Sequence, residues 1–205
     1  MDSISQSVIA SIYCSKEGYH HVYRWLMDLK ERDLNPLYVT MDGEISTMRA
    51  FYAVWPTIHI QRCLYHIQRE GLRWLRTYPK TTAGKELRSL LLGLSSIKSV
   101  KDQKSFILQY KQWLRDHKHF VLSLPRNIKV NYDLRRTMTL INRALPDMFR
   151  YLMDPNIRST SNVLESLYSR IKPAYWQHRG LTQRHKIQFL NWYCYYENQQ
   201  KTNNP

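Results

Sequence analysis

The stretch LYVTMDGEISTMRAFYAVWPTIHIQ, residues 37–61, decides the fold class of this chain. Its first five residues, 37–41, are short and rich in β-branched and aromatic side chains, and they end at Asp42-Gly43, which predicts a strand followed by a turn. Residues 45–54 predict a helix that ends before Pro56, and residues 57–61 alternate as a further strand. The order strand, helix, strand is typical of a parallel α/β layer.

The segment before this stretch extends the same pattern. Residues 7–13 (SVIASIY) are short and rich in β-formers, so they predict a first strand. Between residues 22 and 29, apolar side chains recur at i, i+3, i+4 and i+7, which predicts a helix broken by Asn35-Pro36. Residues 1–62 are therefore expected to form an α/β layer with three strands.

After Arg62 the pattern becomes helical and predicts no further strand. Apolar stripes at helical spacing cover residues 87–94, 106–114 and 141–152, and a segment with proline and asparagine separates the second stripe from the third. Two more helices are predicted at 160–172 and 182–198. This divides the chain into an α/β segment (1–62), a helical insertion (63–157) and C-terminal helices (158–205).

The charge of the chain points to a polyanionic partner. Among 205 residues, Lys and Arg total 31 and Asp and Glu total 16, which leaves a formal net charge of +15. The cations run through the whole chain and are not confined to one amphipathic helix, so nucleic acid is favoured over a membrane surface. Three scattered cysteines predict no disulfide framework, and no signal peptide or membrane span is recognisable, so a cytoplasmic location is expected.

Two carboxylates have settings that suit metal chemistry. Asp42 follows a predicted parallel strand, where ligands gather in α/β sheets, although it could equally cap the next helix. Glu165 could form a capping box with Asn162, yet it is the one acid among six cations between residues 158 and 186. An isolated carboxylate among cations suits a metal ion that meets phosphate.

Three further groups of residues leave alternatives open. Cys63 and His66 form a C-x-x-H that could bind zinc with two more ligands, or could simply lie in the core. A basic stripe at helical spacing could be a phosphate track or an ordinary solvated face. The aromatic residues of the last helix could stack on bases, but so dense a set favours a core role. The stripe consists of Arg62, Arg69, Arg73, Arg76 and Lys80, and the aromatic set of Phe189, Trp192, Tyr193, Tyr195 and Tyr196.

Taken together, several motifs resemble the Mutator-type insertion-sequence transposases, which are D-D-E enzymes with an RNase H-like core. The resemblance covers most of the chain, from about Val8 to Tyr196, and its pieces are specific in combination and order. They are VTMDG (39–43), VWP (54–56), QRCLYHIQR (61–69), RALPDMF (143–149), TSNVLESL (160–167) and HRGL (178–181).

The resemblance implies roles for individual residues. Asp42 matches the second catalytic Asp and Glu165 the catalytic Glu, and both would be ligands of a two-Mg²⁺ site. Cys63 and His66 match the family's C-x-x-H. The long separation between the two acids fits the helical insertion of this family. None of the acids before Asp42 matches the first catalytic Asp, so the chain is expected to be truncated and inactive alone. Those acids are Asp2, Glu17, Asp28, Glu31 and Asp33.

The resemblance therefore predicts a transposase fragment for DNA transposition by metal-dependent strand cleavage and transfer. The alternatives are a non-catalytic basic module that binds nucleic acid, and a small zinc protein. The expected partners are the DNA ends of the element, target DNA and further copies of the chain, in the cytoplasm of a prokaryote. The expected DNA contacts are Arg62, Arg69, Arg73, Arg76, Lys80, Arg170, Lys172 and Arg179.

Overall fold

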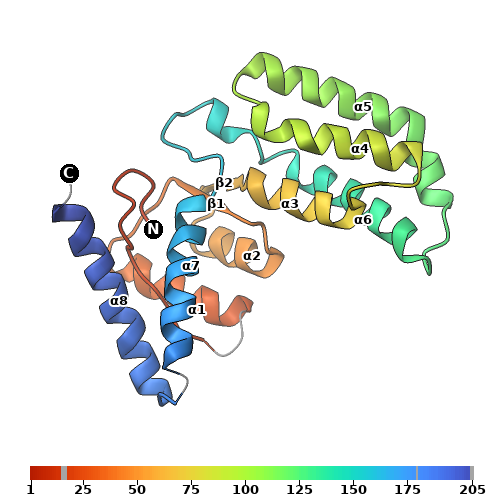
Figure 1. Cartoon of the computed structure of the whole chain (residues 1–205). Coiled ribbons are helices and arrows are strands. Elements are labelled where there is room, and N and C mark those ends of the chain that lie inside the picture. The colour runs from red at the N-terminus through yellow and green to blue at the C-terminus, as the bar shows by residue number, and fades with distance from the viewer. Residues whose placement is uncertain (15–17, 179, 204–205) are drawn as a thin grey trace. The chain divides into compact units, whose positions relative to one another are not determined.

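The structure, a computed structural model, describes residues 1–14, 18–178 and 180–203 (Figure 1). These residues form mostly helices, together with two short strands. The elements are α1 (Tyr19–Glu31), β1 (Tyr38–Met41), α2 (Ile45–Val54), β2 (His59–Arg62), α3 (Leu64–Leu75), α4 (Thr82–Leu92), α5 (Val100–Ser123), α6 (Lys129–Ala144), α7 (Asn162–Gln177) and α8 (Gln183–Asn203), with 3-10 turns at Gly93–Ser96 and Arg150–Leu152.

The strands β1 and β2 pair in parallel, joined by α2 as a βαβ unit. The His59 N–H donates to the Leu37 carbonyl (2.9 Å), and the Cys63 N–H donates to the Met41 carbonyl (2.8 Å). Donor and acceptor advance by the same number of residues in the same direction, which is the register of a parallel pair. The structure thus confirms the predicted order of an α/β segment followed by helices.

The predicted strand at residues 7–13 is wrong, because these residues form no regular secondary structure. The Val8 N–H donates to Asn198 Oδ1 (2.8 Å), and Asn198 Nδ2 donates to the Val8 carbonyl (3.0 Å). A side-chain amide thus satisfies both backbone groups that a neighbouring strand would use. High β-propensity alone does not make a strand where no partner strand lies alongside.

The described residues divide into two compact units. The first consists of residues 1–39, 44–59 and 161–205, so it combines the beginning and the end of the chain. Within it α1 packs on α2, and Lys30 Nζ donates to the Val54 carbonyl at the end of α2 (2.8 Å). The helices α7 and α8 lie side by side (Figure 1) and are joined by an ion pair between Arg170 and Glu197.

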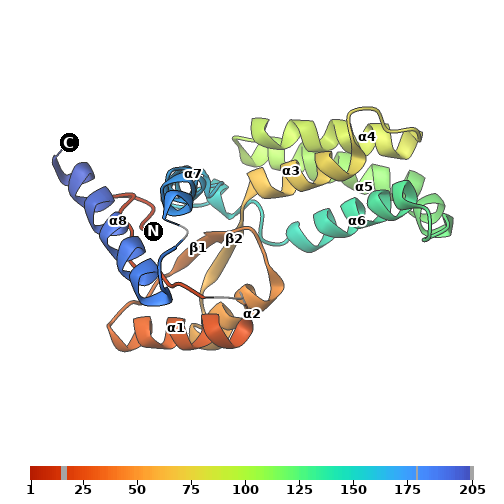
Figure 2. The same ribbon diagram turned by 60° about the horizontal axis from the view of Figure 1, so that its bottom comes forward.

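The second unit consists of residues 40–43 and 60–160 and contains α3, α4, α5 and α6. These helices lie side by side as one group (Figures 1 and 2), with α3 in contact with α4 and α6, and α5 in contact with α4 and α6. Gly71 allows α3 to approach α4 closely, because a Cβ there would lie 2.5 Å from Leu91 Cδ1. The unit is a helical bundle that follows directly from β2.

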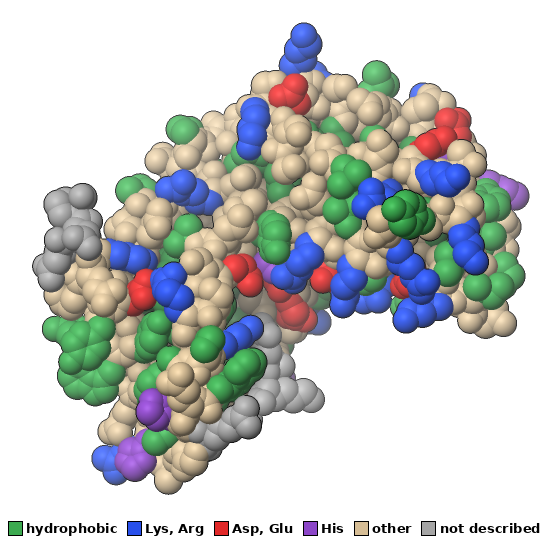
Figure 3. Space-filling model, viewed as in Figure 1, with side chains coloured by type: hydrophobic (Ala, Val, Ile, Leu, Met, Phe, Trp, Pro, Cys, Tyr) green, Lys and Arg blue, Asp and Glu red, His purple; other side chains and the backbone are tan. Residues whose placement is uncertain are grey.

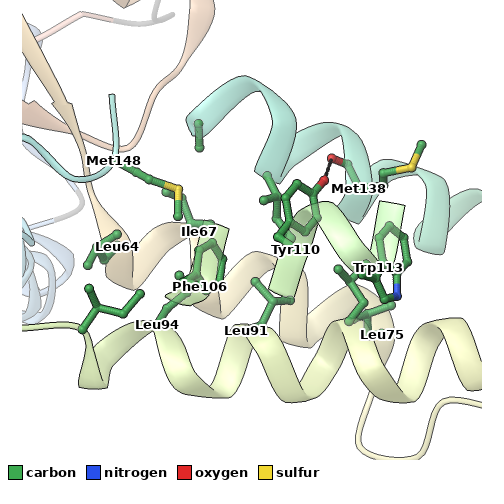
Figure 4. Close-up of a cluster of buried hydrophobic side chains, with 14 of the residues drawn as sticks. Leu64, Ile67, Leu75, Leu91, Leu94, Phe106, Tyr110, Trp113, Met138 and Met148 are labelled. Atoms are coloured by element: carbon green, nitrogen blue, oxygen red, sulfur yellow. Dashed lines mark hydrogen bonds between the residues drawn. The ribbon is translucent and has the colours of Figure 1, made fainter. Parts of the chain in front are cut away.

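Buried aromatic side chains with satisfied polar atoms fix the core of this bundle (Figure 4). The Tyr110 hydroxyl bonds the Met138 carbonyl (3.1 Å) and Asn142 Oδ1 (2.8 Å), which ties α5 to α6. Trp113 Nε1 donates to the Ala83 carbonyl (2.9 Å), which ties α5 to α4. Each bond lets a large ring enter the core without leaving a buried polar atom unpaired.

Candidate functional site

The turn after β1 places Asp42 at the carboxyl end of the strand, as the sequence predicts, and its side chain is exposed. The next residue, Gly43, has φ +88°. A Cβ at this position would come closer than 3.0 Å to the Arg62 guanidinium, a separation that real Cβ atoms essentially never show. The backbone angle therefore favours glycine here, and any larger residue would also have to displace the Arg62 guanidinium.

The Arg62 side chain is buried, with 6% of its surface exposed. Its Nη2 donates to the Asp42 carbonyl (3.1 Å), and its backbone N–H donates to the Asp147 carbonyl (3.0 Å). Burial lowers the pKa of Arg62, while the charges of Asp42 and Asp147 act to raise it. In this structure the Arg62 guanidinium is folded onto the Asp42-Gly43 turn and is buried, so its contact with DNA stays a prediction.

The capping roles considered for the two acids are also wrong. Glu44, not Asp42, is the N-cap of α2, and its Oε2 accepts the Thr47 N–H (2.7 Å). Burial acts to raise the pKa of Glu44, but hydrogen bonds from Ser46 and Thr47 outweigh it, so that this pKa is lowered. The N-cap of α7 is Ser161, one residue earlier than a capping box with Glu165 requires.

The two predicted catalytic acids lie in different units, Asp42 in the second and half-buried Glu165 in the first, so their separation stays a prediction. Within residues 1–14, 18–178 and 180–203, no group of three or more His, Cys, Asp or Glu side chains is placed to hold a metal ion. A two-Mg²⁺ site needs several carboxylate oxygens in one place. The described residues do not provide that ligand set, and we derive no catalytic step through it.

The C-x-x-H pair lies where β2 leads into α3. Cys63 is fully buried and is the N-cap residue of α3, and the half-buried His66 ring meets Tyr65 edge-on, with centroids 5.7 Å apart. The part of the chain that the structure describes offers no further ligands to complete a zinc site with them. Cys63 and His66 therefore pack at the junction between β2 and α3.

The predicted basic stripe does not form one helix face. The helix α3 ends at Leu75, Arg76 takes a positive φ of 62°, and Lys80 follows Pro79 in the loop before α4. The positive φ of Arg76 ends the helical backbone, and Pro79 further disfavours helix at Tyr78. Only Arg69 and Arg73 remain on α3, and Glu70 forms ion pairs with both.

A different basic surface is formed where α3 packs on α6. Lys129, Arg136 and Arg143 are spaced seven residues apart on α6, and all three are exposed. The Arg136 guanidinium lies 3.8 Å from the centre of the Trp74 ring of α3, which ties this row to the helix that carries Arg69 and Arg73. We call these five residues the α3–α6 basic surface. Figure 3 shows Lys and Arg side chains gathered over this region of the bundle.

Residues on α6 were missed by the sequence prediction, although their spacing was a usable signal. Residues seven apart return to nearly the same face of a helix, and the apolar residues of α6 lie on its other side. Because α3 alone supplies two cations, the surface exists only through the packing of two helices that are distant in sequence. The seven-residue spacing therefore indicates the row on α6, but not the packing that joins this row to α3.

A groove of the bundle has the opposite charge. It lies between α4 and α5, has a volume of about 760 Å³, and is lined by the carboxylates Glu86, Asp102 and Asp116 but by no Lys or Arg. Three carboxylates repel phosphate, so this groove is not a nucleic-acid site. The bundle therefore separates an acidic groove from a basic surface.

Other predicted DNA contacts lie in the first unit. Arg170 and Lys172 are exposed on α7, with Arg170 paired to Glu197, whereas Arg179 lies outside the described residues. The expectation that the aromatic set of α8 forms core is wrong for three of its five members. Trp192, Tyr195 and Tyr196 are among the exposed large side chains of the chain.

No described helix is long and apolar enough to cross a membrane. In comparisons with known proteins, this chain matches no family model, no curated protein and no solved structure.

Proposed function

We propose that this chain binds DNA through the phosphate backbone and acts in DNA transposition as a transposase-type protein, its βαβ unit being part of an RNase H-like core. The observation that carries the proposal is the α3–α6 basic surface, where five exposed cations accompany two carboxylates, the half-buried Glu70 and the buried Asp133 of α6. The motifs around Asp42 and Glu165 support the link to transposition.

Charge arithmetic supports phosphate as the ligand. Even if every one of the 16 carboxylates paired with one cation, the chain would keep a formal charge of +15 at pH 7. Arginine guanidinium groups match phosphate oxygens in geometry and stay charged at all relevant pH values. Contacts of this kind position a protein on DNA without reading its sequence.

Strand cleavage and transfer by the same chain is a weaker candidate than binding alone. It would need Mg²⁺ held by Asp42, Glu165 and at least one further acid. The buried guanidinium of Arg62 lies against the Asp42-Gly43 turn, so a fixed positive charge competes there with a divalent cation. This observation favours the non-catalytic form of the proposal, with DNA and further copies of the chain as partners.

Matched double variants test the location of the DNA contacts. Arg136→Ala with Arg143→Ala removes two charges seven residues apart from α6, and Lys104→Ala with Lys111→Ala removes two exposed charges at the same spacing from α5. Binding of a fluorescein-labelled duplex is measured by anisotropy across a salt series, after circular dichroism has shown that each variant is folded.

The α6 variant should lower the slope of log K against log salt by about 1.8, since each lost phosphate contact is worth about 0.9. The α5 variant should leave the slope unchanged. Equal effects of the two double variants would mean that the α3–α6 basic surface is not the contact surface.

A further inference from the structure

The helix α8 carries an exposed aromatic cluster on the side that does not pack. Trp192, Tyr195 and Tyr196 are 58%, 50% and 59% exposed. Three polar residues that bind the rest of the first unit are Glu197, Asn198 and Lys201, which bond Arg170, Val8 and Gln6, while Phe189 and Lys186 contact His178 and Tyr175. At about 100° per residue, the three polar residues lie roughly 140°, 240° and 180° around the helix from Trp192. The aromatic cluster therefore lies on the solvent-exposed side of α8.

The three rings contact one another and form a continuous aromatic platform. Trp192 stacks on Tyr196, with ring centroids 5.8 Å apart and an angle of 27° between the ring planes. Tyr195 meets Trp192 edge-on at 5.7 Å and Tyr196 at 5.5 Å. Rings that support each other in this way lose little further conformational freedom when a flat ligand stacks on them.

The neighbours of the platform indicate the chemistry of its ligand. At helical spacing the same face carries the exposed residues Arg184, His185, Gln188 and Gln199 and no carboxylate, and the exposed Ile187 lies beside its edge, about 60° from Arg184. Trp, Tyr and Arg also occur in protein-docking surfaces, so the rings alone do not identify the ligand. A cation without any carboxylate favours a polyanion. Aromatic faces beside amides and a cation match the unpaired bases of such a polyanion, whose faces stack and whose edges accept and donate hydrogen bonds.

We propose that this face, which we call the α8 aromatic face, binds single-stranded DNA by base stacking. The inference deepens the proposed function and rests on DNA being the partner. It adds a second kind of contact, made to the bases of an unpaired strand instead of the phosphates of a duplex. The platform spans one turn of α8, which suits one or two bases.

The test uses the full chain and three 20-nucleotide probes labelled with fluorescein. They are oligo-dT, an abasic strand that keeps the phosphates but has no bases, and a duplex. The variants are Trp192→Ala, Tyr196→Ala and the conservative Trp192→Phe. The control is Tyr78→Ala, which removes an 88% exposed ring located in the loop before α4.

Trp192→Ala and Tyr196→Ala should each weaken oligo-dT binding about fivefold or more, the usual effect of losing one stacked base. Their affinity for the abasic strand and the duplex should not change, Trp192→Phe should keep most of the binding, and Tyr78→Ala should match the wild type. Oligo-dT binding that is absent, or insensitive to both alanine variants, would overturn the inference. So would a shift in sedimentation on Trp192→Ala without loss of oligo-dT affinity, because a second copy would then cover this face.

The two proposals can fail separately in this experiment. Wild-type protein that binds the duplex, with oligo-dT binding unchanged by Trp192→Ala, would leave the proposed function standing and remove the stacking site. Oligo-dT binding that depends on Trp192, without any duplex binding, would keep the stacking site and remove the duplex contact.

Discussion

Substitution of Gly43 by alanine should destabilise the second unit strongly. The backbone at this residue has φ +88°, and a Cβ there would overlap the buried Arg62 guanidinium. The backbone conformation costs an L-residue about 1–2 kcal/mol. Displacement of Arg62 removes its bond to the Asp42 carbonyl, and hydrogen bonds to charged groups contribute about 1.5–3 kcal/mol. The expected loss is about 3 kcal/mol.

Thermal unfolding followed by circular dichroism measures this loss. For a chain of this size, about 3 kcal/mol corresponds to a decrease in Tm of about 6–12 °C. Gly93→Ala is the matched control, because Gly93 lies in the same unit, has φ −75°, and has no atom within 4 Å of the position that an alanine Cβ would take. Its Tm should stay the same or rise slightly, because alanine reduces the entropy of the unfolded chain.

A double variant separates the clash from the backbone cost. When Arg62→Ala is combined with Gly43→Ala, the overlap disappears, so the double variant should lose less stability than the two single variants together, by about 1 kcal/mol or more. Strictly additive losses would refute the reasoning, because they would show that Arg62 does not make glycine necessary at this turn.

Three further outcomes follow from the structure. Tyr110→Phe removes the hydroxyl that bonds Met138 and Asn142, so urea unfolding should show a loss of about 1–2 kcal/mol, and no loss would contradict the assigned bonds. Burial, with a smaller effect from Asp102, raises the pKa of Tyr151 to about 12, so the unfolded chain releases this proton first and stability should fall between about pH 10 and 12. Between about pH 10 and 12 the urea midpoint of Tyr151→Phe should therefore fall less than that of the wild type. With Mg²⁺ or Mn²⁺ the purified chain should not cleave or join DNA, and strand transfer that is abolished by Asp42→Ala would contradict this.

Local patterns in the sequence were sufficient for most helices. The predicted helix at 45–54 has the bounds of α2, because Glu44 caps its start and Pro56 follows its end. The strand prediction at 7–13 failed because pairing depends on a partner that is distant in sequence, and the partner proved to be the side chain of Asn198. β-Propensity is a property of a single segment, whereas a strand forms only when two segments pair by hydrogen bonds.

The candidate site was predicted less completely, and for the same reason. Asp42 lies at the end of a strand, as the sequence predicts, but helical spacing assigns Arg62 to a basic stripe and does not reveal that it lies against the turn at Gly43. Arg62 lies at the end of the next strand, so only the parallel register of β1 and β2 brings it to Gly43. The exposure of Trp192 likewise depends on which side of α8 packs, and that side is fixed by polar bonds that hydrophobic periodicity does not reveal.

The salt dependence of duplex binding tests the central claim most directly. If all five cations of the α3–α6 basic surface contact phosphates, log K should fall against log salt with a slope of about −4.5. Two duplexes of unrelated sequence should give the same slope and nearly the same affinity. A slope near zero, or tight binding to only one of the two sequences, would contradict the proposal that this chain holds DNA by its phosphates.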